Sequence, residues 1–252
     1  MKIISSPAKL MKLNPHQSIL TPTTPSFIKE AELIQSHLRE KSPKFLSELM
    51  EISQKLADEN WERNQKWSSA PDSEHSSSAL YTFTGEVYKG LDADSLAPQS
   101  VEYLQENYRI LSGLYGLLRP SDRIMLYRLE MGRAFQFEGY KNLYDFWSER
   151  LTHHFNSELE EDEAILNLAS AEYSKALNRK NLKGKWIDFE FYEMSSGKPK
   201  TIVVYTKHAR GLMIRFCAQN QLKTLEEVKA FNDGGYLLDD ERSTDSKLVF
   251  IR

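Results

Sequence analysis

The chain has 252 residues, with 33 Lys and Arg against 36 Asp and Glu, and a formal net charge of −3. Apolar residues make up 40% of the chain and charged residues 27%, close to ordinary globular usage, which excludes a protein disordered throughout. The longest apolar runs fall far short of the roughly 20 residues that cross a bilayer. We therefore expect a folded chain with no transmembrane helix.

The N-terminal residues lack the long apolar stretch of a secretory signal, which favours a cytoplasmic location. The single cysteine, Cys217, cannot form an internal disulfide, and this suits the same reducing compartment. The six histidines form no cluster with cysteine and no His-x-x-x-His pair. We expect no dedicated metal site and no cofactor.

The first half of the chain is mainly helical in pattern. A short strand is expected at residues 2–5, and from Phe27 to Leu38 apolar residues recur every three or four positions, as in an amphipathic helix. Ser42-Pro43 is a typical helix start, with a polar cap before a proline at the first helical position. A third helix is expected to end near Pro71.

The second half mixes strands with helices. The expected elements are a buried strand at 164–168, a hairpin of strands 186–192 and 201–205, helices at 209–218 and 225–231, and a closing pair of strands at 236–238 and 248–251. Together these patterns predict one α+β domain spanning residues 1–252. Its mixed β-sheet is surrounded by helices, and a helical excursion runs from about residue 26 to 110.

Basic and acidic residues are segregated into separate stretches of the sequence, although the net charge is small. Residues 194–225 hold six Lys and Arg and no acid, and residues 174–187 hold five and no acid. Five acids lie between Glu158 and Glu163. Sorted charge can create a positive surface that attracts phosphate, or it can simply form solvated faces.

The segment from Ile110 to Asp122 has the highest density of candidate ligand-binding residues in the sequence. The Ser112 hydroxyl, the Tyr115 phenol and nearby backbone N–H groups can hold an anion or a ribose, and Arg119 suits a phosphate or carboxylate. The alternative is a structural turn in which Arg119 pairs with Asp122. Arg128 beside Tyr127 is a further cation. Neither a P-loop nor a dinucleotide-binding fingerprint occurs.

Several motifs in chain order resemble the YaaA family of bacterial peroxide-stress proteins. They are Ser5-Ser6-Pro7-Ala8-Lys9, the run from Phe83 to Leu91, the run from Ser112 to Pro120, Tyr127 to Gly132, Asn167 to Tyr173, Lys207 to Gly211, and Phe231 to Tyr236. The resemblance covers essentially the whole chain. It implies a cytoplasmic protein that limits damage by unincorporated iron under hydrogen peroxide and binds DNA through a positively charged cleft and a helix-hairpin-helix-like element.

The residues that match this element can be examined directly. Residues 81–88 are expected to form its first helix, residues 89–92 its turn, and a second helix is expected to start near Pro98. Lys89 would supply a cation beside Gly90, but Asp92 and Asp94 would repel a phosphate there. The run from Tyr115 to Pro120 is the alternative hairpin.

The segment Lys207 to Arg215 is the strongest phosphate-binding motif. If a helix begins at Lys207 after a strand, Arg210 lies over the same face, and a phosphate would compensate the cations at the helix start. In the alternative reading Glu172 neutralises Lys207 or Arg210 inside the protein.

Two hypotheses about function follow. In the first, a non-enzymatic protein holds double-stranded or structured DNA without base specificity, through phosphate contacts to Lys9, Lys89, Arg119, Arg128, Lys207, Arg210 and Arg215. In the second, an enzyme acts on a nucleotide-like or phosphorylated small molecule. Its polar cleft would contain Ser6, Ser112, Tyr115 and Glu172, with Glu172 as the candidate general base. Direct iron chelation is the least supported reading, because the acidic clusters resemble solvated faces.

Overall fold

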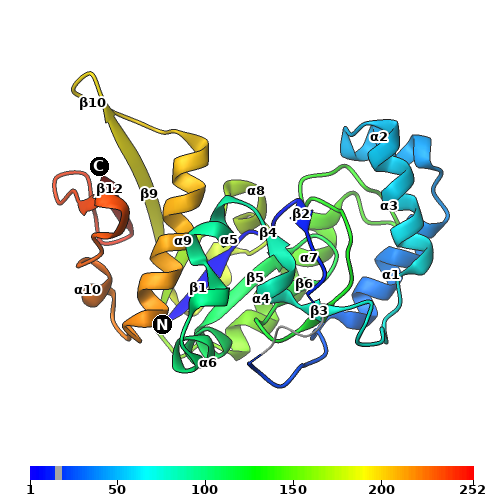
Figure 1. The fold of residues 1–252 in the computed structure, drawn as a ribbon, viewed down its shortest axis with the longest axis horizontal. Helices are drawn as coiled ribbons and strands as arrows, with labels where there is room; N and C mark the ends of the chain where they lie inside the picture. Colours follow the sequence, from blue (N-terminus) through cyan, green and yellow to red (C-terminus); the bar gives the residue numbers. More distant parts are fainter. Residues whose placement is uncertain (15–18) are drawn as a thin grey trace.

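A mostly parallel sheet lies at the centre of the molecule. The computed structural model describes residues 1–14 and 19–252 (Figure 1). The strands lie in the order β11-β12-β9-β8-β1-β5-β6, with β10 paired to β9. From β12 to β5 neighbouring strands are parallel, whereas the edge strands β11 and β6 are antiparallel to their neighbours. This confirms the expected α+β class with a mixed sheet.

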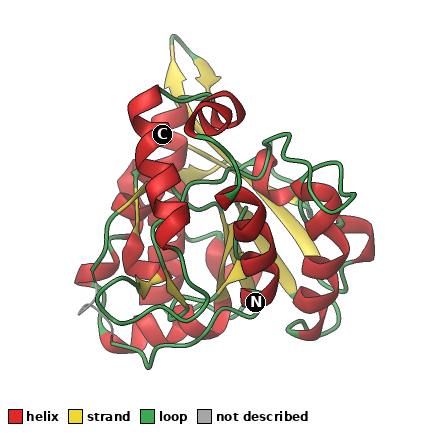
Figure 2. Ribbon diagram, turned by 90° about the vertical axis from the view of Figure 1, so that its right-hand side faces the viewer, coloured by secondary structure: helices red, strands yellow, loops and turns green. Residues whose placement is uncertain are grey.

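The strands of the main sheet are β1 (Lys2–Ser5), β5 (Tyr108–Ser112), β6 (Gly116–Leu118), β8 (Ala164–Leu168), β9 (Lys185–Ser195), β10 (Lys198–Lys200), β11 (Leu237–Leu238) and β12 (Lys247–Ile251). Two small pairs join β2 (Leu10–Met11) to β4 (Phe83–Thr84) and β3 (Ser77–Ser78) to β7 (Arg123–Ile124). The helices are α1 (Ile28–Arg39), α2 (Pro43–Met50), α3 (Gln54–Lys66), α4 (Ala79–Thr82), α5 (Glu86–Leu91), α6 (Pro98–Asn107), α7 (Leu143–Ser157), α8 (Ala171–Ser174), α9 (Val203–Gln219) and α10 (Leu225–Val228). Helices flank the strands on both sides (Figure 2).

The central strands are buried on both faces, which explains their continuous apolar sequences. Ile3 and Ile4 of β1 and Ile165 and Leu166 of β8 are fully buried. Such runs are typical of parallel strands that are covered by helices on both sides. The strand expected at 164–168 and the closing strand pair near the C-terminus are therefore confirmed.

Strand β1 lies at the point where the strand order reverses direction. The chain passes from β1 to β5 on one side, and later returns to β8 on the other side before continuing to β9 and β12. In open α/β sheets ligands bind in the crevice outside the carboxyl ends of the strands at such a switch point. The residues that follow β1 and β8 therefore mark the position of a candidate site.

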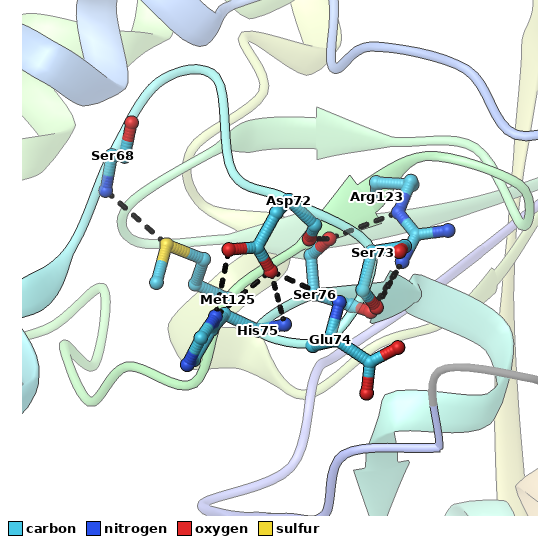
Figure 3. Close-up of polar contacts among 8 residues, drawn as sticks. All are labelled: Ser68, Asp72, Ser73, Glu74, His75, Ser76, Arg123 and Met125. Atoms are coloured by element: carbon cyan, nitrogen blue, oxygen red, sulfur yellow. Dashed lines mark hydrogen bonds and ion pairs between the residues drawn. The ribbon is translucent and has the colours of Figure 1, made fainter.

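The helices α1 to α3 form a lobe at the opposite end of the molecule from α9 and β9 (Figure 1). The expected helix starts are confirmed, since the Ser42 side chain accepts a hydrogen bond from the Phe45 N–H at the start of α2. The loop after α3 is tied back to the body through Arg123, which donates to the Ser76 hydroxyl (2.9 Å) and the Ser73 carbonyl (2.8 Å) (Figure 3). Asp72 accepts from the backbone N–H of His75 in the same loop (Figure 3).

The expected strand at 201–205 is wrong. Strand β9 pairs with β8 and β12 along most of its length, and only its last residues form a hairpin with β10. The chain then enters α9, where the Thr206 N–H donates to the Ile202 carbonyl (2.9 Å). Val203 and Val204 are exposed on its first turn. The β-branched sequence favours a strand locally, but the helical hydrogen bonds override this weak preference.

The expected helix over residues 81–88 is also wrong, because three short elements occupy that stretch. Helix α4 ends at Thr82, Phe83 and Thr84 pair with β2, and Gly85 has a φ of +133° that a helix does not allow. Helix α5 follows and is separated from α6 by a short 3₁₀ turn, so the helix expected near Pro98 is confirmed. Gly90 lies within α5 and not in a turn.

Gly90 and Gly211 allow α5 and α9 to pack closely. A Cβ atom at Gly90 would lie 2.2 Å from the carbonyl oxygen of His208, and one at Gly211 would lie 1.9 Å from the carbonyl oxygen of Val87. Real side chains cannot approach backbone this closely, so each position requires glycine. The glycine of the proposed DNA-binding turn therefore has a packing role.

Among the described residues, no helix combines the length and apolar composition needed to cross a membrane.

Replacing Gly211 with alanine should separate α5 from α9, since the new methyl group overlaps the Val87 carbonyl. We expect the free energy of unfolding to fall by about 3 kcal/mol, at the upper end of the usual overpacking cost. Urea denaturation of Gly211→Ala measures this. Gln219→Ala, an exposed change at the end of α9, is the control and should alter stability by less than about 0.5 kcal/mol. Equal stability of the two variants would show that the close helix packing is not required.

Candidate functional site

The loop after β1 is the centre of the candidate site, because it contacts several distant segments. The Ser6 hydroxyl accepts a hydrogen bond from the Ser170 N–H (2.9 Å), which follows β8. The Tyr88 hydroxyl of α5 donates to the Ser6 carbonyl (3.1 Å). A Cβ atom at Gly85 would lie 3.4 Å from the Ala8 side chain. The start of α5 therefore lies beside the residues that follow β1.

Glu130 is a buried carboxylate at this loop, and its side chain is surrounded by cations. Its carboxylate lies 2.9 Å from Arg128, 3.4 Å from Lys9 and 3.8 Å from Arg133. Arg133 also pairs with Glu51 (2.9 Å), and this links the cluster to the end of α2. A carboxylate buried to this extent requires such partners. Lys9 and Arg128 thus lie together and share one buried carboxylate of the protein.

Glu172 is held away from the cations of α9. Its carboxylate accepts a hydrogen bond from the Gly132 N–H (3.1 Å) and its backbone carbonyl accepts one from the Tyr144 hydroxyl (2.8 Å). Within the described part of the chain it forms no ion pair with Lys207 or Arg210. The internal neutralisation considered for these two cations is therefore not what the structure contains.

Lys207 and Arg210 are one helical turn apart on α9. Across residues 1–14 and 19–252 neither side chain has a carboxylate within ion-pair distance. The Nε atom of Arg210 is buried without a hydrogen-bond acceptor, and burial lowers the pKa of its guanidinium. Helix α9 begins at Val203, so Lys207 is its fifth residue. The dipole at the start of the helix therefore has only a weak effect on the charge of Lys207.

Lys89 lies next to these residues but is paired. Its ammonium group is 2.6 Å from the Glu86 carboxylate, and His208 of α9 approaches the same carboxylate at 4.0 Å. The hydrogen bond from Lys89 lowers the pKa of Glu86, with help from the charges of His208 and Lys207. Both Lys89 and Glu86 are exposed enough for this pair to be weak.

Two of the predicted phosphate-binding arginines are engaged elsewhere. Arg119 lies one residue past β6, toward the amino end of β5, and approaches Asp122 at 3.8 Å, as in the structural alternative. Arg215 donates to the carbonyl oxygens of Leu91 (3.0 Å) and Asp92 (2.9 Å) and anchors the end of α5. The structure does not bring these arginines together with Lys9 and Arg210.

Ser112 and Tyr115 lie in the interior and do not line a cleft. The Ser112 hydroxyl is 2.6 Å from the Tyr127 hydroxyl and accepts from the Tyr115 N–H (2.9 Å). The Tyr115 hydroxyl accepts from the Trp67 indole (2.8 Å), and burial raises its pKa. The run from Tyr115 to Pro120 begins with the Gly116 turn into β6, so it forms a β-hairpin with β5.

A pocket of about 730 Å³ opens at the carboxyl end of β8. Arg210 is the only sequence-predicted site residue among those that line it in the described chain. The pocket also contains Asn167 of β8, Asp188 of β9 and Lys247 of β12, which sequence reasoning missed. Asn167 lies within an apolar strand, Asp188 in an alternating strand and Lys247 at the start of an apolar strand, and only the strand register shows that they lie side by side.

No group of three or more His, Cys, Asp or Glu side chains is placed to hold a metal ion in the described chain.

The whole chain resembles known proteins of one family. The family described as peroxide stress protein YaaA matches residues 1–242. The chain belongs to the YaaA family. A UPF0246 protein of Flavobacterium johnsoniae is 44% identical over 252 residues, which cover the full length of both chains. UPF0246 proteins of Marinomonas sp. and Neisseria meningitidis are 43% and 40% identical over 252 and 254 residues, covering all of this chain and 97% and 98% of theirs.

Membership of the YaaA family supports a role in peroxide stress, so the chemistry of Cys217 matters. This thiol is fully buried on α9, and burial raises its pKa to about 12. Peroxide reacts with the thiolate and hardly with the thiol. The structure therefore gives Cys217 a packing role and disfavours direct peroxide sensing by this residue.

Replacing Glu130 with alanine should leave three clustered cations without their shared buried partner. We expect a loss of about 3 kcal/mol in the free energy of unfolding, as is typical when one member of a buried ion pair is removed. Chemical denaturation measures it. The control is Lys9→Ala, whose side chain is 58% exposed, and it should cost less than about 1 kcal/mol. A neutral Glu130→Ala would contradict the structural role assigned to the cluster.

Cys217 should be unreactive in the folded protein. Treatment with hydrogen peroxide or a thiol reagent at pH 7 should leave it unmodified by intact-mass measurement, whereas the protein unfolded in urea should be labelled fully. Rapid modification of the native protein would mean that the thiol is reachable, contrary to its burial.

Proposed function

We propose that this YaaA-family protein binds the phosphate backbone of DNA at the surface around the loop after β1. The observation that carries this proposal is the pair Lys207 and Arg210 on α9, cations that have no carboxylate partner in the described chain. Lys207 is exposed to solvent, whereas Arg210 is half-buried. A half-buried charge without a counterion is unfavourable, and a phosphate oxygen would compensate that of Arg210.

Two exposed lysines support the proposal. Lys89 on α5 lies close to α9 through its shared neighbour Glu86, and this exposed pair contributes little, so Lys89 can turn to a phosphate at small cost. Lys9 follows β1 and is 58% exposed, and the buried Glu130 keeps Arg128 and Arg133 as partners when Lys9 turns to a phosphate. We assign no phosphate contact to the turn between α5 and α6, because Asp92 lies there and Arg215 is already bonded to it.

The proposed contacts are to the backbone of the duplex, so binding is expected to tolerate any base sequence. A protein that covers DNA in the cytoplasm during peroxide stress would keep iron-driven radical chemistry away from the bases. This proposed protection of DNA connects the family's role in peroxide stress with phosphate binding by the cations of α9.

Duplex DNA should bind with an affinity that falls steeply as salt rises, since each phosphate contact contributes about −0.9 to the log–log slope. Lys207→Ala should weaken binding at every sequence and make the slope less steep by roughly one contact. Fluorescence anisotropy with a labelled duplex between 50 and about 200 mM salt measures both quantities.

Lys55→Ala is the matched control for this experiment, because Lys55 is an exposed lysine on α3, in the lobe farthest from α9. It should bind DNA as the unmodified protein does. The proposal fails if affinity does not change with salt, or if Lys55→Ala and Lys207→Ala weaken binding equally.

A further inference from the structure

We infer that the pocket at the carboxyl end of β8 is a binding site for a phosphorylated small molecule that carries a ribose. This inference shares Arg210 with the proposed DNA contact but does not rest on DNA binding, because the other side chains that carry it, Asn167, Asp188 and Lys247, line the pocket and have no part in the DNA proposal.

The floor of the pocket is a row of polar side chains on three neighbouring strands. Asn167 of β8 pairs in register with Asp188 of β9, which pairs in register with Lys247 of β12. Residues paired in this way lie on the same face of the sheet. Three neighbouring strands thus place polar side chains on a single patch, and Glu190, two residues beyond Asp188 on β9, lines the same pocket. Packing alone does not require such a row.

Asp188 is held in a fixed orientation. Its carboxylate accepts hydrogen bonds from the Asn167 amide and the Trp186 indole (2.8 Å each), and Arg179 lies 3.1 Å away. The Asn167 side-chain oxygen in turn accepts from the Ala169 N–H (3.1 Å). The Asp188 side chain is still 35% exposed to the pocket, so a free lone pair can accept a ligand hydroxyl.

The charge of the lining favours a dianion. The lining contains five cationic and two acidic side chains, namely Lys175, Arg179, Lys180, Arg210 and Lys247 against Asp188 and Glu190. Arg179 and Lys247 pair with the two acids, at 3.1 and 3.4 Å. Within the described residues Arg210 has no such partner, and its planar guanidinium can bind a phosphate through two parallel hydrogen bonds. A phosphate monoester carries roughly −1.5 to −2 charges at neutral pH and matches this excess.

The size of the pocket fits the same class of ligand. A volume of about 730 Å³ lies within the range of small-molecule sites and exceeds what inorganic phosphate fills. In the arrangement we infer, the phosphate contacts Arg210 with Lys175 and Lys180 at the rim, and the ribose hydroxyls contact Asp188 and Asn167. The source of this chemistry is either a free sugar phosphate or a mononucleotide.

Isothermal titration of the full chain with ribose 5-phosphate, adenosine 5′-monophosphate, adenosine and inorganic phosphate tests the inference. We expect both ribose phosphates to bind more tightly than adenosine or phosphate. Equal affinity for ribose 5-phosphate and adenosine 5′-monophosphate indicates a sugar-phosphate site. A clear preference for the nucleotide indicates a mononucleotide site. Either result supports the inference. Failure of both to bind would overturn it, as would equally tight binding of inorganic phosphate.

Two variants separate the roles of the pocket residues. Arg210→Gln removes a charge that has no ion-pair partner in the described chain, so we expect the fold to be retained, and it should weaken binding of the ribose phosphates about tenfold or more. Arg210→Lys keeps the positive charge but lacks the planar guanidinium. Its affinity for the ribose phosphates should lie between those of the unmodified protein and Arg210→Gln. Asp188→Asn should bring the affinity for ribose 5-phosphate close to that for inorganic phosphate.

Lys55→Ala is again the control, and circular dichroism checks the fold of every variant. Unchanged affinity for ribose 5-phosphate in Arg210→Gln would overturn the assignment. Because this titration contains no DNA, its result is independent of the anisotropy experiment, and either proposal can fail alone.

Discussion

The position of β1 between β5 and β8 is the constraint on which the rest of the structure depends. Because β1 is short and is buried from Ile3 to Ser5, the chain leaves the sheet directly at Ser6 and meets Ser170, which leaves it after β8. This junction fixes the distance between the loop that carries Lys9 and the loop that carries Glu172. The motifs around Lys9, Glu130 and Glu172 are far apart in sequence and meet only because these parallel strands are neighbours.

The cations around this junction are of two kinds. Those around Glu130 belong to a cluster of alternating charge that holds the loops together, and their partner is buried inside the protein. Arg210 lines the pocket beside residues of β8 and β9, but the described chain provides no counterion for it. The first kind contributes to stability, and the second is the kind for which we propose an external anion. This distinction could not be made from the sequence, where both kinds appear as arginines beside aromatic or small residues.

The sequence predicted the elements well where local and tertiary preferences agree. The amphipathic helix from Phe27, the capped helix at Ser42-Pro43 and the apolar strand at 164–168 are all present. The prediction was wrong at 201–205, where a β-branched run lies in the first turn of α9. The sequence predicted only part of the pocket lining, because the register between neighbouring strands cannot be read from the sequence of one strand. Asp188 appeared as one more polar residue in an alternating strand, and only its pairing with Asn167 shows its place.

The close contact between α5 and α9 connects packing with function. Gly211 follows Arg210 directly, and Gly90 follows Lys89 directly, so the two glycines that touch lie beside two of the cations considered for ligand binding. Because neither glycine leaves room for a side chain, the helices cannot slide or separate without opening the core beneath them. The helical positions of Lys89, Lys207 and Arg210 are therefore set by backbone contact. The motif Lys207 to Gly211 thus combines the two cations that we propose for ligand binding with the glycine that places them.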